Sequence, residues 1–214
     1  DFALSEEQVE LVETVRAVLA RRSDPQAVRA ALVQPHGYDP ELWRVLCEQV
    51  GVAALGVPEQ YDGAGATLLE SLLVLEELGR TLTPGPLLST VLVTEALLAA
   101  AEEPALAELL PRLAAGEVGV WVDPASARPV LDADRAAFAI VATDDGALAL
   151  ADAGAFAATW TPSMDPGLRL GEVALDRARL RRIGEAAPAR RRVEQVLTAA
   201  TAALAVGCAE RGLR

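Results

Sequence analysis

The sequence predicts an α+β protein: an N-terminal all-α helical bundle, a small and mostly antiparallel middle β domain, and then the first helix of a C-terminal helical domain. Apolar residues recur at helical spacing up to Gly116, alternation typical of strands follows, and the helical period returns from Arg190. We therefore expect domains at residues 1–116, 117–185 and 186–214.

The composition excludes several classes of protein. The 214 residues include 31 acidic residues and 19 basic residues, all of them Arg, for a net charge of −12. This length and an apolar fraction of 52% support a folded core. The acidic excess argues against a nucleic-acid partner. No apolar window is long enough to span a bilayer, and the acidic start lacks the cationic region of a secretory signal, so we expect a cytoplasmic protein without a membrane span.

The two cysteines favour neither a disulfide nor a metal site. Cys47 and Cys208 lie far apart, with no CxxC pattern and no His nearby. We therefore expect no metal ligands, and we expect His36 to be a solvated loop residue.

Capping signals mark the first helix. Ser5 and Gln8 form a capping box, with Leu4 and Val9 as its hydrophobic staple. Apolar residues from Val9 to Leu19 then recur at helical spacing, which predicts one buried stripe.

Similar signals open the later helices. Asp24-Pro25 and Asp39-Pro40 each place an N-cap before a proline, and Thr67 with Glu70 forms a second capping box. Gly51 is expected to end the helix that Asp39 begins. Two more helices are expected near residues 86–101 and 104–115, the second closed by Gly116, and residues 56–66 form a loop.

Short strands follow Gly116. Val118, Val120 and Val122 alternate with Gly119 and Trp121, which indicates a strand. Further strands are expected at residues 138–143, 147–152 and 169–175, with a hairpin turn at 144–146. The last helix is expected from Arg190 with Gly212 as a possible C-cap, and it has little to pack against.

One segment carries a family resemblance. Residues 56–82, GVPEQYDGAGATLLESLLVLEELGRTL, resemble the signature of the acyl-CoA dehydrogenase family, in which a Pro-Glu-x-Tyr-Gly-Gly-like turn precedes a helix carrying Glu-Glu-Leu-Gly. Asp62 stands where the first Gly is usual. Segments 82–98, 109–118, 163–176 and 202–214 continue the resemblance in the same order.

The resemblance implies a cofactor, a substrate and partners. It implies FAD between the middle and last domains, an acyl-CoA thioester beside the flavin, an electron-transfer acceptor, and a homo- or hetero-oligomer. The implied reaction is α,β-desaturation, in which a carboxylate takes the α proton and the β hydrogen leaves as hydride to the flavin. In this family the carboxylate comes from the C-terminal helical domain, and no residue here matches it, so we name no catalytic residue. We expect Glu76 and Glu77 to be solvated helix charges or ion-pair partners.

The middle domain departs from the family pattern. Members usually carry a Thr-Glu-Pro turn and a Gly-Ser-Asp segment that contact the flavin and the pantetheine; here residues 121–128 read WVDPASAR. By this resemblance Trp121, Val122, Asp123 and Ser126 are the candidate cofactor-binding residues, although Val122 replaces the Thr whose hydroxyl would bond the flavin. The following block comes early, as if one hairpin were skipped. Either that loop is missing from this stretch, or the chain is a diverged subunit that binds flavin poorly on its own face.

Three residues are candidates for substrate binding. By the resemblance, Glu59 lies near the far end of the acyl pocket, and the alternative is a structural turn carboxylate. Leu87 and Leu88 could wall the acyl cavity or be ordinary core residues. Trp121 likewise could pack on the flavin or fill the seam between domains. The cluster Arg190-Arg191-Arg192 could meet a phosphate, but a charge run that faces water or Glu194 is favoured.

Three functions follow from this reading. The first is an FAD-dependent acyl-CoA dehydrogenase subunit. The second is a non-catalytic partner subunit that completes a neighbour's site, because the Arg-only, Ala-rich composition suits GC-rich bacteria, which often keep paired subunits of which one lacks the base. The third is a helical binding module without flavin.

Overall fold

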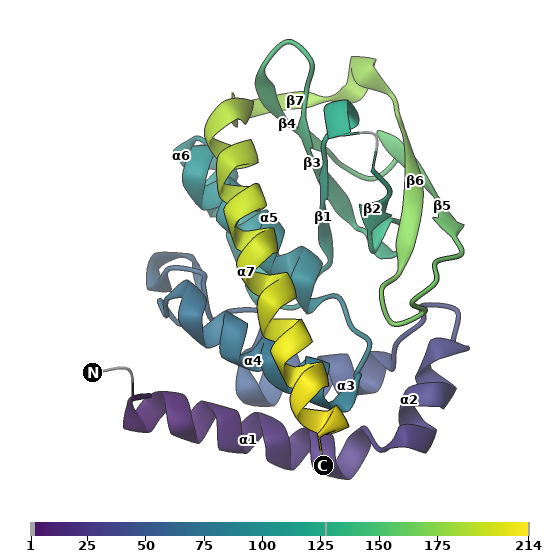
Figure 1. Cartoon of the computed structure of the whole chain (residues 1–214). Coiled ribbons are helices and arrows are strands. Elements are labelled where there is room, and N and C mark those ends of the chain that lie inside the picture. Colours follow the sequence, from purple (N-terminus) through teal and green to yellow (C-terminus); the bar gives the residue numbers. More distant parts are fainter. Residues whose placement is uncertain (1–2, 127, 214) are drawn as a thin grey trace.

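Helices form one layer of the molecule, and two small β-sheets form the other layers (Figure 1). The structure is a computed structural model that describes residues 3–126 and 128–213, so Ala127 of the 121–128 stretch lies outside the described residues. The N-terminal helices are α1 (Glu6–Arg22), α2 (Pro25–Leu32), α3 (Pro40–Val45), α4 (Leu68–Thr81), α5 (Leu87–Ala100) and α6 (Glu103–Ala114). Among these helices, none is long and apolar enough to cross a membrane, and the same holds for the remaining described helix.

The predicted caps are confirmed. The Ser5–Gln8 and Thr67–Glu70 capping boxes are both present, and Asp24 accepts hydrogen bonds from the first turn of α2. Asp39 does the same for α3. These side chains satisfy backbone N–H groups that have no partner within a helix.

The helix ends and the first helix bring one confirmation and one correction. Gly51 adopts a left-handed conformation and ends the π-helical turn Leu46–Val50 that extends α3, as expected. The buried stripe of α1, however, begins at Val12. Val9 is 42% exposed and Leu4 is 41% exposed, so the staple pair does not reach the core.

The β part contains two sheets. The four-stranded sheet has the order β1-β3-β4-β7, and the three-stranded sheet has the order β2-β6-β5. The strands are β1 (Gly119–Val122), β2 (Val130–Leu131), β3 (Phe138–Ala142), β4 (Ala147–Ala151), β5 (Phe156–Thr161), β6 (Leu170–Leu175) and β7 (Arg181–Glu185). Only β1 and β3 pair in parallel, which confirms the mostly antiparallel domain.

Sequence reasoning found four of these strands and missed three. The expected strands correspond to β1, β3, β4 and β6, and the turn at Gly146 joins β3 to β4 as predicted. β2 has two residues, β5 consists mainly of Ala and Thr, and β7 begins with two arginines. None of the three shows the apolar alternation on which the prediction depends.

The four-stranded sheet is covered on both faces. Phe138, Ile140 and Leu150 pack against the helices in the main core. Val120, Val122 and residues of β3 and β4 form a second cluster against the three-stranded sheet. Because side chains alternate along β1, Trp121 faces the helices whereas Val122 faces the other sheet.

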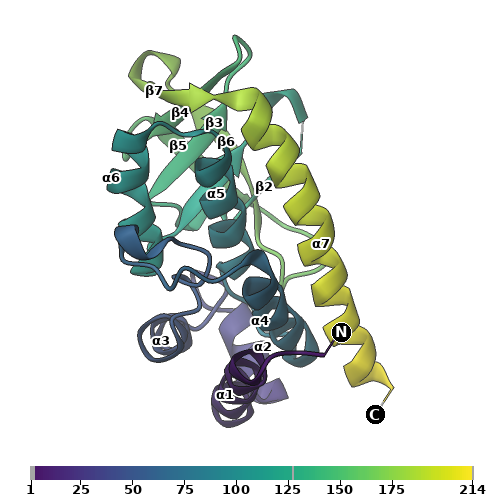
Figure 2. The same cartoon turned by 90° about the vertical axis from the view of Figure 1, so that its left-hand side faces the viewer.

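The last helix, α7 (Ala186–Gly212), begins four residues earlier than predicted, and its C-cap is Leu213 rather than Gly212. The expectation that it has little to pack against is wrong, because α7 lies along α4 and α5 (Figure 2). A Cβ on Gly79 of α4 would stand 2.3 Å from the Leu204 carbonyl oxygen of α7. The two backbones therefore touch, and periodicity in one helix cannot reveal this contact.

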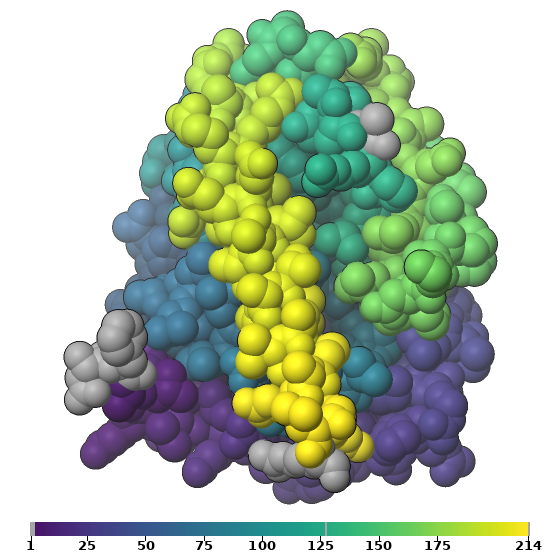
Figure 3. All heavy atoms as spheres, viewed as in Figure 1, coloured from purple at the N-terminus to yellow at the C-terminus, as the bar shows by residue number. Residues whose placement is uncertain are grey.

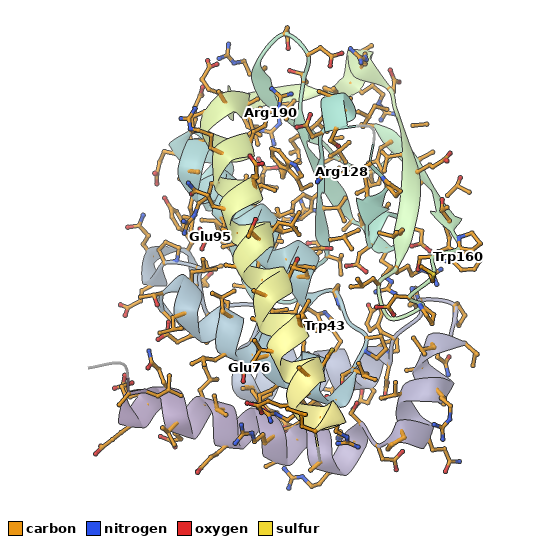
Figure 4. The ribbon with its side chains drawn as sticks, in the orientation of Figure 1. Trp43, Glu76, Glu95, Arg128, Trp160 and Arg190 are labelled. Carbon is orange, nitrogen blue, oxygen red and sulfur yellow. The ribbon has the colours of Figure 1, made fainter. Side chains whose placement is uncertain are left out.

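Glu77 corrects the expectation of a solvated face on α4. Its side chain is 2% exposed and accepts hydrogen bonds from Arg16 of α1 and Arg80 of α4. Arg80 also pairs with Glu210 of α7, so the network joins three helices. Glu76 lies beside it, where α7 passes over α4 (Figure 4).

The three predicted domain boundaries fall close to changes in secondary structure. Residue 116 lies between α6 and β1, and residue 185 ends β7 immediately before α7. The division into three domains itself stays a prediction.

Candidate functional site

A hollow of about 340 Å³ lies where the helices meet the β part. Its walls come from α5, from Trp121 at the end of β1, from the segment that follows β1, and from α7. Figure 3 shows the surface hollowed between α7 and the neighbouring β segments. A volume of roughly 300–1,000 Å³ is usual for small-molecule sites, so the hollow is large enough for one flat ring system.

Trp121 supplies the flat wall of the hollow. Val120 and Val122 are buried on the opposite face of β1, so alternation turns the indole toward α5 and α7. Leu92 and Leu197 complete an apolar slot in front of it. This arrangement suits an aromatic or alicyclic ligand that stacks on or beside the indole.

An ion pair stands at the rim. Arg190 donates to the carboxylate of Asp123 at 3.0 and 3.2 Å, and also to the carbonyl oxygens of Ala142 and Thr143. The pair connects the first turns of α7 to the segment after β1, as Figure 4 shows for Arg190. Since Arg190 is held by four oxygens, it positions this rim rather than waving in solvent.

The arginine cluster is therefore not a simple solvated run. Arg190 pairs with Asp123, and Arg192 donates to Glu95 of α5 at 2.7 Å. Glu95 is 8% exposed, so this second pair ties α7 to the core of the helical layer. The interpretation that the cluster faces water or Glu194 is wrong for these two residues.

Two other predicted cofactor residues lie in different places. Ser126 lines the hollow, and its hydroxyl donates to the carbonyl oxygen of Asp123 at 2.8 Å. Val122 is 5% exposed and packs between the two sheets. The structure thus brings Trp121, Asp123 and Ser126 together and leaves Val122 on the other face of the strand.

A buried polar cluster lies under the hollow. Ser89 of α5 donates to Asp132 at 2.5 Å, and Arg135 donates to the same carboxylate at 2.7 Å. Asp132 is 4% exposed, and burial raises its pKa to about 6. The guanidinium of Arg135 lies 4.7 Å from the ring centre of Tyr38, and its Nε and Nη2 have no hydrogen-bond partner among the described residues. The cluster joins α5, the loop before α3 and the β part.

The predicted substrate residues are not in the walls of this hollow. Leu87 and Leu88 are 0% and 7% exposed in the main core. Glu59 is exposed in a short turn beside α6, where Tyr61 donates to Glu103 at 2.7 Å. On α5 the hollow is lined instead by Ser89 and Leu92.

Sequence reasoning missed Ser89 and Leu92 because α5 is apolar almost all round. Periodicity cannot select a face of such a helix. The one available signal was the small group of polar residues in an otherwise apolar helix, to which Ser89 belongs.

The comparisons with known proteins agree with this architecture. Residues 5–117 match the model of the acyl-CoA dehydrogenase N-terminal domain. The chain is 44% identical over 170 residues to acyl-CoA dehydrogenase IpdE2 of Mycobacterium tuberculosis, a match that covers 78% of this chain and 51% of that protein. It is 52% identical over 106 residues to IpdE2 of Mycolicibacterium smegmatis, which covers 50% of this chain and 34% of that protein. The chain thus spans about half the length of the first relative and about a third of the second.

Solved structures share the fold. The ChsE4-ChsE5 complex from Mycobacterium tuberculosis aligns over 100% of this chain and 66% of that chain, with a TM-score of 0.83 and 25% identity. PigA, solved with FAD and proline, aligns over 99% of this chain and 67% of that chain, with a TM-score of 0.79; its 18% identity shows the fold alone. The family model covers more than half of the chain, and the order of helices, sheets and final helix agrees with it. The chain belongs to the acyl-CoA dehydrogenase family.

Proposed function

We propose that this chain forms part of a subunit of an FAD-dependent acyl-CoA dehydrogenase that introduces an α,β double bond into an acyl-CoA thioester. The observation that carries the proposal is the hollow between Trp121, α5 and α7 in a chain of this family. The resemblance implies flavin and thioester at the seam between the middle and last domains, and the hollow lies on that seam.

The residues of the hollow fit a flat tricyclic ring. Trp121 offers a flat face, Leu92 and Leu197 are apolar walls, and Ser126 offers a hydroxyl at the rim. FAD bound here would supply the hydride-accepting chemistry. PigA, which has this fold, holds FAD, and this supports the assignment.

The chain's own residues would position ligands and exclude water. Trp121 and Leu197 keep the slot apolar, and a dry slot strengthens every polar contact inside it. The Asp123–Arg190 pair fixes the rim between the β part and α7. We assign no proton-transferring residue among the described residues, because no carboxylate in this hollow matches the family position of the base.

A second candidate is a non-catalytic partner subunit. Val122 points between the sheets where the family resemblance places a flavin-bonding hydroxyl, which favours a chain that binds flavin weakly by itself. The similarity to one subunit of the ChsE4-ChsE5 complex supports an assembly of two different chains. The expected cytoplasmic location and the electron-transfer acceptor stay predictions.

The test begins with the complete gene product that contains this chain. We expect a visible flavin spectrum that bleaches when a panel of acyl-CoA thioesters is added with an electron acceptor. A colourless protein that gains flavin and activity only with a co-expressed family member supports the partner role. Absence of flavin in both preparations contradicts both candidates and favours the binding module.

A pair of variants connects the result to the hollow. Leu197→Trp fills the slot, whereas Thr198→Trp adds the same ring on the exposed face of α7. We expect the first variant to lose bound flavin or raise the KM for the thioester, and the second to behave like the original protein. Equal behaviour of the two variants would contradict the assignment of the hollow.

A further inference from the structure

Strand β5 has an unpaired edge at the surface of the molecule. In the sheet β2-β6-β5 it pairs residue by residue with β6, from Phe156 to Thr161. No other strand of the described chain adjoins its second side, and β5 lies at the outer margin of the β part in Figure 1. An edge strand presents a row of backbone N–H and C=O groups that another extended strand can satisfy.

This edge carries few of the features that normally block pairing. Residues 153–164, AGAFAATWTPSM, contain no charged side chain, and the first proline follows the strand at Pro162. The register with β6 runs without a bulge over six residues, which is an ordinary strand length. Lysines, prolines or bulges protect most natural sheet edges, and β5 has none of them within its length.

An apolar tip continues the edge. Trp160 is 50% exposed, Met164 is 102% exposed and Leu168 is 41% exposed. All three lie at one end of the β5–β6 hairpin, where Trp160 pairs with Gly171, and Figure 4 shows Trp160 at the margin of the β part. The guanidinium of Arg169 lies 5.2 Å from the Trp160 ring centre and is itself held by Asp134, so the ring has a fixed place.

We propose that β5 pairs antiparallel with β5 of a second copy of this chain, so that two three-stranded sheets become one six-stranded sheet. Charge favours this occupant: two copies that each carry −12 repel one another, and the uncharged β5 segment brings no like charges together. An antiparallel pair of identical strands is self-complementary, as a two-fold interface requires. The proposal goes beyond the proposed function, since it requires neither flavin nor substrate.

Cysteine cross-linking of the complete gene product tests the pairing. The exposed Cys208 is first replaced by Ser; Cys47 can stay, because burial raises the pKa of its thiol to about 12. Opposed residues of antiparallel strands have Cα atoms about 4.5–5.5 Å apart, within the range that a disulfide spans. We expect Cys at one or more of positions 157, 158 and 159 to give a cross-linked homodimer under mild oxidation.

Ala174→Cys is the matched control. Ala174 pairs with Ala157 and is also exposed, but it lies on the central strand β6. Its counterpart in the proposed dimer would be about 14 Å away, at three strand spacings, which is too far for a disulfide. Cross-linking of the control to the same extent as the β5 variants would overturn the proposal.

Sedimentation provides a second, independent measurement. In Ala157→Lys the two new charges face each other across the proposed interface, and we expect dimerisation to weaken by about fivefold or more, with Ala174→Lys closer to the original protein. Unchanged association of the β5 variant, absence of any cross-link from β5, or cross-links to a different polypeptide would each overturn self-pairing. Flavin content is measured separately, so failure of this proposal is distinguishable from failure of the proposed function.

Discussion

The contact between α4 and α7 leads to a specific stability prediction at Gly207. A Cβ added to this residue would stand 2.0 Å from the carbonyl oxygen of Glu76 and 2.7 Å from the backbone nitrogen of Arg80. Non-bonded heavy atoms pack best at about 3.5–4.0 Å, so Gly207→Ala requires α7 to move away by roughly 1–1.5 Å. The atoms that it meets belong to the backbone of α4 and cannot rotate away.

The magnitude follows from two opposing effects. Overpacking of a tight contact costs typically about 1–3 kcal/mol, and replacing Gly by Ala inside a helix returns up to about 1 kcal/mol. Displacement of α7 also disturbs the ion pair between Arg80 and Glu210, which lies one turn further along the contact. We expect the free energy of unfolding to fall by about 2 kcal/mol, or Tm to fall by roughly 4–8 °C for a protein of this size.

Urea unfolding followed by far-UV circular dichroism measures the effect. The control is Gly212→Ala in the same helix, where an added Cβ meets nothing within 4 Å. We expect this control to leave the free energy of unfolding unchanged or slightly higher. If the two variants agree within about 0.5 kcal/mol, the usual scatter of neutral surface substitutions, the reasoning about backbone contact is refuted.

Three more predictions use the same unfolding measurement. Burial raises the pKa of Asp132 from 3.8 to about 6, so the folded state binds an extra proton between these values; the free energy of unfolding of the original protein, relative to Asp132→Asn, should fall as the pH rises from about 4 to about 6, and a difference that rises or stays flat contradicts this. Glu77→Gln removes a buried partner of two arginines and should cost about 2 kcal/mol, less than the loss for a fully buried pair because Arg16 is 51% exposed; Glu76→Gln, with a 27% exposed side chain, should cost less, and the reverse order would contradict the network. Trp43→Phe deletes the indole N–H that donates to the Gly116 carbonyl oxygen at 2.9 Å and should cost about 1 kcal/mol; no loss would show that this bond adds nothing.

The parts of the fold that sequence reasoning predicted are those specified by neighbouring residues. Caps such as Ser5–Gln8 and the turn at Gly146 depend on side chains and dihedral angles within a few positions. Strands with clear alternation, such as β1, were predictable for the same reason. The family resemblance also rested on a local run, the turn and helix of residues 56–82.

The candidate site was predictable only in part. Trp121, Asp123 and Ser126 were found by resemblance, and the structure brings them to one hollow. The placement of Val122 follows from which face of β1 meets the second sheet, and no local pattern specifies that. Leu92 belongs to a helix that is apolar all round, so its role in the wall depends on α7 passing beside it.

By itself, then, the sequence determined the capping, the α+β order, the acidic charge and the family, because each depends on composition or on residues close together along the chain. The tertiary structure alone decided that Glu77 is buried between two arginines, that Arg190 meets Asp123, and that Asp132 lies in a dry cluster with Ser89. Their partners are separated by between 43 and 67 residues along the chain. Burial and ion pairing at such separations arise only when whole elements pack, and that packing also creates the hollow.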